Sequence, residues 1–252
     1  PVAEVDKAGY LQFPVVIGGV VAVVNLKGIK PGELVLDGKT MADIFQKKIT
    51  NWNDPAIKKL NPNLSLPNQE ITTIVRADAS GTTAVFTDYL CQVNTDFKNN
   101  VGSNKQVNWG TTGVAAGKGN AGVAAFVQQL NGAIGYVEYS YAKQGKLTHV
   151  AMRDNKGKVV QPDEASFAEA AGKANWKVPG MAANLNNVSG WPITATTFIL
   201  VYKEGNQKTA DVIKFFDWAY SKGDTIATEL DYVPLPGQVK SLIRAKWAKE
   251  VK

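Results

Sequence analysis

The chain has 252 residues, 44% of them hydrophobic and 20% charged, and a formal net charge of +6. This composition is typical of a globular protein with a sizeable core, organised as one large or two modest domains. The most apolar stretch, residues 15–24, is too short to span a bilayer and contains two glycines. A single cysteine and a single histidine exclude an internal disulfide and argue against a Cys/His metal site.

The positive charge makes nucleic-acid binding a rival function. However, the lysines are scattered, and no run of about five or six basic residues occurs. We therefore interpret the charge as a solvated basic surface and expect no nucleic-acid partner. A modest positive field still helps to attract small anions.

The first part of the chain alternates helical and strand patterns. Residues 2–9 predict a short helix, and residues 13–25 predict a long strand in which the glycine pair 18–19 marks a bulge or bend. Further helices are expected from Thr40 and from Pro55, where proline suits the first turn.

A strand, a tight turn and a helix follow one another near the middle of the chain. Residues 71–75 are a β-branched run that suits a buried strand. Arg76 and Asp78 come next, and residues 80–83 form a small polar turn. Apolar residues then recur at helical spacing over residues 85–97, which predicts one helix.

The remaining elements continue this alternation of helices and strands. They are a Gly/Asn-rich connection over 99–120, a helix over 122–130, a strand over 135–139, a helix over 139–146, a hairpin over 150–160, a helix over 164–174, a loop over 181–190, a strand over 191–202, and helices over 211–222, 223–230 and 239–249. The helix over 211–222 is expected to pack through Val212, Phe215, Phe216 and Tyr220. The alternation favours an α/β architecture. Two long strands, around residues 20–25 and 194–200, are candidate crossings between two lobes.

The turn after the central strand favours an anion. The first turn of a helix carries N–H groups without internal partners and a partial positive charge. Ser80, Thr82 and Thr83 add hydroxyl donors, and Gly81 permits close approach to the backbone. Arg76 offers a planar fork that matches two oxygens of a tetrahedral oxyanion.

Asp78 is unexpected beside an anion, because a carboxylate repels it. Its presence makes sense if it orients Arg76, or if the ligand carries a proton to donate. A plain structural alternative is a helix capped by Ser80 with a surface Arg–Asp pair, since Ser-Gly-Thr is common capping chemistry. From these residues alone the two interpretations stay open.

The stretch RADASGT, from Arg76 to Thr82, resembles the second phosphate-contacting segment of the phosphate-binding proteins that serve ABC-type phosphate uptake. Other segments resemble the same family in the same order, over residues 12–25, 32–45, 49–62, 132–143, 191–200 and 212–220. The resemblance covers essentially the whole chain.

This resemblance implies a two-lobed α/β fold of the type II periplasmic binding protein kind, with two crossing strands at the hinge. Residues 1–25 and 191–252 would form the first lobe, and residues 26–190 the second. Members of the family begin with further strands and loops that carry the other half of their phosphate site. This chain starts at what looks like the proline of a later turn, so the first lobe is expected to be incomplete and phosphate binding to be weakened.

The resemblance also implies a function. The chain would bind inorganic phosphate through Arg76, Asp78, Ser80, Gly81 and Thr82, and deliver it to the membrane permease subunits of an ABC transporter. We expect a monomer in the periplasm or another extracytoplasmic space, without catalytic residues, cofactor or metal. The alternative is a phosphate-ester hydrolase or transferase that uses the same anion-binding loop.

Two further motifs suggest other chemistry. The stretch from Gly117 to Gly122 fits G-x-G-x-x-G, but no clear strand precedes it, so dinucleotide binding is not expected. His149 is the only histidine, and without a G-x-S-x-G elbow we expect it to be structural or exposed.

Overall fold

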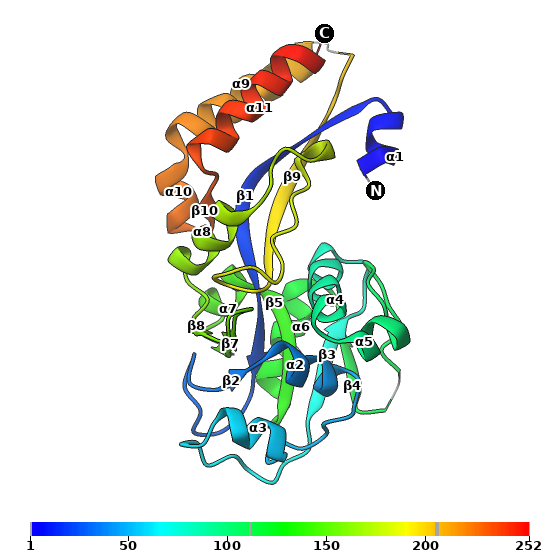
Figure 1. The fold of residues 1–252 in the computed structure, drawn as a ribbon, viewed down its shortest axis with the longest axis vertical. Coiled ribbons are helices and arrows are strands. Elements are labelled where there is room, and N and C mark those ends of the chain that lie inside the picture. Colours follow the sequence, from blue (N-terminus) through cyan, green and yellow to red (C-terminus); the bar gives the residue numbers. More distant parts are fainter. Residues whose placement is uncertain (1, 111, 205–206, 252) are drawn as a thin grey trace.

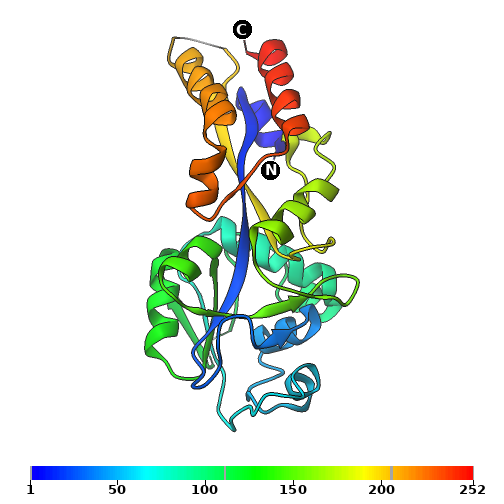
Figure 2. The same ribbon diagram turned by 90° about the vertical axis from the view of Figure 1, so that its left-hand side faces the viewer.

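The structure is a computed structural model that describes residues 2–110, 112–204 and 207–251. The prediction that Pro1 is the proline of a turn in the related family lies outside these residues. It is an α/β protein with an upper and a lower half in the view of Figure 1, as predicted. The long strand β1 (Tyr10–Val24) runs through both halves, which confirms the first predicted crossing (Figures 1 and 2).

Strand β1 changes partners along its length. Its first part pairs antiparallel with β9 (Thr194–Tyr202) and β10 (Val233–Pro234) in the upper half. Its last part pairs antiparallel with β5 (Ala133–Glu138) and β6 (Thr148–His149) in the lower half. The two halves therefore share one strand, and the change of partners falls between Gly19 and Val20.

The lower half is built on parallel strands. Strand β3 (Thr72–Arg76) lies between β5 and β4 (Val114–Gly117), and all three run in the same direction. Because Val20 of β1 pairs with Glu138 at the end of β5, the carboxyl ends of these strands meet at the edge next to the upper half. In α/β sheets, ligands bind outside the carboxyl ends of the strands.

The other elements of the lower half surround this sheet. They are β2 (Val35–Leu36), β7 (Ala151–Arg153), β8 (Val159–Val160), α2 (Gly38–Phe45), α3 (Pro55–Leu60), α4 (Gly81–Val93), α5 (Thr95–Asn100), α6 (Gly119–Gln129) and α7 (Tyr139–Gln144). Phe86 of α4 stacks on Tyr136 of β5 at 4.4 Å between ring centroids, and Phe45 of α2 packs edge-on against Phe86. These buried rings fix α4 against the sheet.

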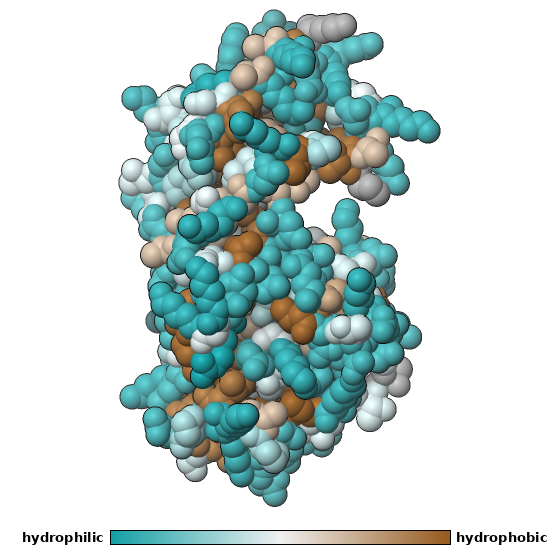
Figure 3. All heavy atoms as spheres, viewed as in Figure 1, coloured by the Kyte–Doolittle hydropathy of each residue, from teal (hydrophilic) through white to brown (hydrophobic). Residues whose placement is uncertain are grey.

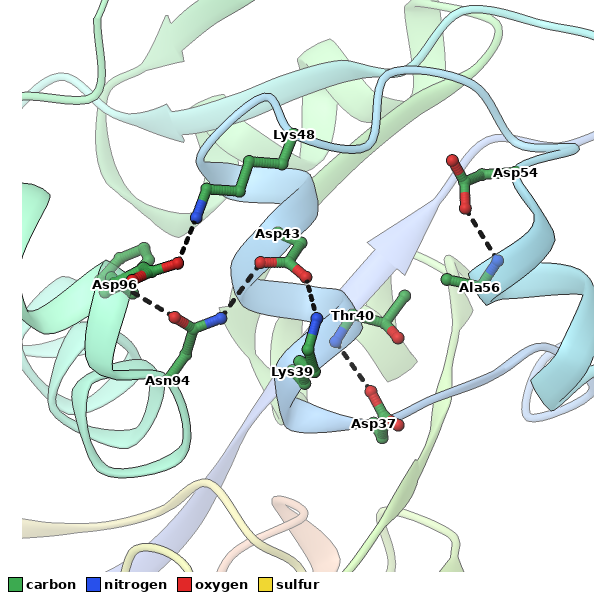
Figure 4. A network of polar contacts seen from close by, with 10 residues as sticks. Asp37, Lys39, Thr40, Asp43, Lys48, Asp54, Ala56, Asn94 and Asp96 are labelled. Carbon is green, nitrogen blue, oxygen red and sulfur yellow. Dashed lines mark hydrogen bonds and ion pairs between the residues drawn. The ribbon is translucent and has the colours of Figure 1, made fainter.

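A polar network holds the far end of α4 as well (Figure 4). Asn94, which follows α4, donates from Nδ2 to Asp43 of α2, and Lys39 pairs with the same carboxylate. Lys48 pairs with Asp96 of α5 at 2.7 Å. The apolar face of α4 packs on the sheet, and the residue after its C-terminal end is hydrogen-bonded to α2. These contacts fix the position of the N-terminus of α4.

The upper half gathers the two ends of the chain. It contains α1 (Val2–Lys7), α8 (Glu164–Lys173), η1 (Pro179–Met181), α9 (Gln207–Lys222), α10 (Asp224–Glu229) and α11 (Gly237–Glu250). Trp247 of α11 stacks on Tyr220 of α9 and meets Phe13 of β1 edge-on, which packs the helices against the strand.

Two predictions for the central segment are wrong. The predicted connection over 99–120 contains β4, which the sequence hides because Val-Ala-Ala-Gly is short and lies beside glycines. The predicted helix over 85–97 is two helices, α4 and α5. It breaks because Asn94 adopts an extended backbone and its side chain accepts the N–H of Phe97, so it caps a new helix.

Two further expectations fail nearer the chain ends. The shift in strand register lies between Pro14 and Val16 rather than at glycines 18 and 19. Gly19 instead makes room for the ring of Phe167, which a Cβ would overlap. On α9, the sequence predicts that Phe215 packs inward, but 57% of its surface is exposed. Val212 and Phe216 are half-buried.

The lobe limits remain a prediction. The sequence predicts that residues 26–190 form the lower half, yet η1 packs against α1 and β1, and α8 contacts β1, β9 and β10. These contacts favour a boundary nearer residue 160. Strand β9 starts at the junction and continues into the upper half, in pairing with residues 10–19 of β1.

Candidate anion-binding site

The helix that follows β3 starts with a capped turn. The side-chain oxygen of Ser80 accepts the N–H of Thr83 at 3.2 Å, and the backbone N–H of Ser80 donates to the carbonyl of Lys105. Ser80 is only 3% exposed. Its hydroxyl proton is not used by the cap, because the oxygen acts there as acceptor.

Arg76 and Asp78 form a bidentate ion pair. Arg76 donates from Nε to Asp78 Oδ1 at 2.9 Å and from Nη2 to Asp78 Oδ2 at 2.6 Å. The Arg76 side chain is only 10% exposed, so its guanidinium is held in one orientation at the end of β3. This contact is the one that the first explanation of Asp78, the orientation of Arg76, requires. The capped helix and the Arg–Asp pair of the structural alternative are present too, so the geometry alone is compatible with both interpretations.

The loop between β4 and α6 supports this pair. The N–H of Gly119 donates to Asp78 Oδ1 at 2.9 Å. Hydrogen bonds from Arg76 and then Gly119 hold the pKa of Asp78 well below its usual range. Asp78 therefore stays ionised at neutral pH and acts only as an acceptor.

Tyr136 of β5 lies beneath the turn. Its hydroxyl accepts the backbone N–H of Arg76 at 3.3 Å and lies 2.8 Å from the hydroxyl of Thr83. Thr83 is buried, so its hydroxyl braces the turn instead of facing a ligand, contrary to expectation. Neither Tyr136 nor Gly119 was predicted from the sequence. The only signal was that Gly119 falls within the G-x-G-x-x-G match, whereas the contact of Tyr136 needs the three-dimensional pairing of β5 with β3.

Gly81 and Thr82 form the accessible part of the turn. Gly81 is exposed, and a Cβ built on it would meet nothing within 4 Å. Thr82 is half-buried. The structure thus brings the five predicted residues to one turn, in which the side chains of Arg76 and Ser80 are largely buried and Gly81 is exposed.

A groove between the two halves begins beside this turn. It has a volume of about 350 Å³ and is lined by Ala84, Val85 and Asp88 of α4 on one side and by residues 194–196 and 198 of β9 on the other. Asn186 bridges the halves at the groove, because its Nδ2 donates to Val85 O and to Asp88 Oδ2. Figure 3 shows a notch between the halves on its right-hand side, just above the position of α4 in Figure 1.

Strand β4 precedes the G-x-G-x-x-G match, so the lack of a strand does not argue against dinucleotide binding there. The packing supplies another reason. Gly117 is required because a Cβ there would overlap the backbone of Gly122 and Val123, where α6 crosses the end of β4. The N–H of Gly119 is already bonded to Asp78. The loop therefore serves the neighbouring turn, and its glycines are explained without a dinucleotide.

Within the described ranges, no group of three or more His, Cys, Asp or Glu side chains is placed to hold a metal ion. His149 lies on β6, paired with Val23 of β1, and its ring meets that of Tyr139 edge-on at 6.2 Å. Burial lowers the pKa of His149 below its ordinary 6.5. In the same described ranges, no helix combines the length and the apolar character that crossing a membrane requires.

The fold and the site together define a class of protein. Two α/β halves share a strand, and the groove between them is bordered by α4 at Ala84, Val85 and Asp88, just after the candidate anion-binding turn. This is the arrangement of the two-lobed solute-binding proteins, in which the halves close around a ligand.

Comparison with known proteins specifies the family. Residues 2–222 match the profile described as PBP superfamily domain. The phosphate-binding protein PstS of Haemophilus influenzae is 51% identical over 248 residues, which cover 96% of this chain and 74% of that protein. PstS of Xylella fastidiosa strain Temecula1 is 46% identical over 257 residues, covering 99% and 70%. The chain belongs to the PBP superfamily and, within it, to the family of the phosphate-binding protein PstS.

The solved structures agree in fold. The phosphate-binding protein from Stenotrophomonas maltophilia has a TM-score of 0.72 at 19% identity, and the match covers 94% of this chain and 70% of that one. This likeness confirms the two-lobed α/β architecture predicted from the sequence.

Proposed function

We propose that this chain binds inorganic phosphate in the groove between its halves and delivers it to the membrane permease subunits of an ABC transporter. The relatives that share about half of its residues are named phosphate-binding protein PstS. The hydrolase or transferase alternative is not favoured by these names.

The observation that carries this proposal is the fixed guanidinium of Arg76 below the first turn of α4. Two of its N–H groups hold Asp78, and the others remain for an anion. Phosphate would lie over Gly81, where it could accept the N–H groups of Gly81 and Thr82 and the hydroxyls of Ser80 and Thr82. The helix dipole adds a favourable potential at the same point.

The details of this role are part of the proposal. The site residues are Arg76, Asp78, Ser80, Gly81 and Thr82, and no covalent chemistry takes place there. Ser80 supports this view, because its oxygen serves the helix cap and the only histidine lies on a different strand, β6. We propose that the chain acts as a monomer in an extracytoplasmic space, with the halves closing as two lobes.

Isothermal titration of phosphate tests the site. Replacing Arg76 by alanine removes charge-assisted hydrogen bonds worth about 1.5–3 kcal/mol. The affinity for phosphate is therefore expected to fall roughly ten- to a hundredfold. Arg153→Ala is the matched control, since Arg153 donates to the carbonyl of Gly157 in the β7–β8 hairpin. Unchanged affinity in Arg76→Ala, or an equal loss in both variants, would contradict the assignment.

A further inference from the structure

Glu138 occupies the junction between the two halves. It is the last residue of β5 and pairs with Val20 of β1, one position beyond the last residue of β1 that pairs with β9. Its backbone N–H donates to the side chain of Asn120, next to the loop that holds Asp78. The side chain leaves the lower half and meets the upper half at Tyr232, which precedes β10.

The two oxygens of the Glu138 carboxyl group differ in their hydrogen bonds. Oε2 accepts the backbone N–H of Ser140 at 3.2 Å and the hydroxyl of Tyr232 at 3.3 Å, and the hydroxyl of Ser140 bonds to it as well. Oε1 is buried and, among the described residues, has no hydrogen-bond partner. It lies against β1 at Gly18, where a Cβ would stand only 3.0 Å away.

An ionised carboxylate is poorly suited to this place. A buried charge needs a counter-ion or a full set of donors, and Oε1 has neither in the described structure. The charged neighbours are Asp231 and, on α7, Lys143, but the Nζ of Lys143 is 2.7 Å from Asp231 and is thus already paired. Burial raises the pKa of Glu138 above its ordinary 4.5, and the charge of Asp231 adds to this, while the donors Ser140 and Tyr232 oppose it.

We propose that Glu138 is a positioning residue that acts as a proton-dependent latch: when neutral it keeps its Oε1 docked on Gly18 of β1, and when ionised it loosens that contact, while the hydrogen bond from Tyr232 opposes the loosening. This inference rests on the proposed function only where it concerns phosphate, since the latch itself is a property of the hinge. A raised pKa in the docked arrangement means that docking is favoured below that pKa and weakened as the pH rises through it.

Distances between the halves test the latch directly. Nitroxide labels on Lys58→Cys of α3 and Lys214→Cys of α9, both exposed positions, in a Cys91→Ser background report that distance by pulsed EPR. From about pH 4 to about pH 8, the unmodified hinge is expected to pass from a narrow distribution to a broader one. Glu138→Gln, which mimics the neutral carboxyl, is expected to keep the narrow distribution at every pH.

Two more variants distinguish the contribution of Glu138 to the pH transition from that of neighbouring groups. His149→Gln removes the other group that titrates in this range and is expected to leave the transition unchanged. Tyr232→Phe removes a hydrogen bond that lowers the pKa of Glu138, so the midpoint of the transition is expected to move to higher pH. It also serves as the independent variant if Glu138→Gln fails to fold.

The outcomes distinguish the latch from the phosphate site. A distribution that does not change with pH, a transition that persists in Glu138→Gln, or one that disappears in His149→Gln would overturn the latch. Phosphate titration of the same chains at a fixed pH is the second readout. Phosphate binding that depends on Arg76 without a pH transition would overturn the latch and support the proposed function. A pH transition that depends on Glu138 in a chain that does not bind phosphate would support the latch and overturn the proposed function.

Discussion

At the scale of single residues, the candidate site is prepared before any ligand arrives. Arg76 loses little freedom on binding an anion, because Asp78 already holds its guanidinium in place. Pre-orientation of this kind lowers the entropic cost of binding. This orientation has an electrostatic cost, because Asp78 places a negative charge near the proposed anion. Asp78 is itself stabilised by the N–H of Gly119.

The ion pair of Asp78 makes stability depend on pH. Because the pKa of Asp78 is lowered in the folded chain, its contribution is present above the ordinary value of 3.8 and is lost as the pH falls toward the lowered value. Asp78→Asn is therefore expected to lower the melting temperature at neutral pH, and this difference should shrink on acidification below about pH 4. Thermal denaturation of both chains across pH measures it, and a constant difference would contradict the role given to the carboxylate.

At the scale of elements, two strand–loop–helix units build the site together. The unit β3–α4 supplies Arg76 and the helix N-terminus, and the unit β4–α6 supplies Gly119. Their parallel pairing brings both loops to the same edge of the sheet. The close crossing of α6 over the end of β4 at Gly117 fixes the position of the second loop.

Gly117→Ala is expected to disturb this crossing. The added methyl group would overlap the backbone at Gly122 and Val123, which cannot move like a flexible side chain. Overpacking of this kind costs about 1–3 kcal/mol. Chemical denaturation would measure the loss, and phosphate affinity should fall as well because Gly119 shifts.

Gly172→Ala is the matched control for this prediction. Gly172 lies within α8, and a Cβ on it would meet nothing within 4 Å. Alanine is favoured over glycine inside a helix by roughly 0.5–1 kcal/mol, so this variant is expected to be slightly stabilised. A Gly117→Ala chain as stable as Gly172→Ala would show that the crossing tolerates the methyl group.

Many of the helices and strands around the site could be predicted from the sequence. The features that could not be predicted all depend on the pairing of distant strands. The strand before Arg76 and the capped helix after Ser80 are local patterns, and both are present. Strand β4 is stabilised by its pairing with β3 rather than by its own residues, so local propensity does not reveal it. Tyr136 and Gly119 reach the site through the same pairing, which no local pattern contains.

At the scale of the whole molecule, the shared strand β1 and the latch at Glu138 couple the halves, while one face of the upper half stays open. Four large apolar side chains on α9, on α10 and directly after α10 are about half exposed, namely Phe215, Trp218, Ile226 and Leu230. They border a groove of about 330 Å³ that reaches Val15 and Val16 of β1. A contiguous apolar face of this kind favours association.

Removing two of these side chains is expected to reduce self-association of the chain at high concentration. In sedimentation velocity experiments, the unmodified chain should be a monomer at low concentration and associate only at high concentration, whereas Phe215→Ser with Trp218→Ser should remain monomeric throughout. Lys208→Ala on the same helix is an exposed control that leaves the apolar face intact. Equal sedimentation of all three chains over the concentration series would show that this face does not drive association.

The central claim is that phosphate is held at the first turn of α4, between the halves. Titration of the ¹⁵N-labelled chain with phosphate, followed by amide resonances, tests it most directly. We expect saturable shifts that are largest for Gly81 and Thr82 and absent in Arg76→Ala. Shifts centred on other residues, or no saturable shift at this turn, would contradict the claim.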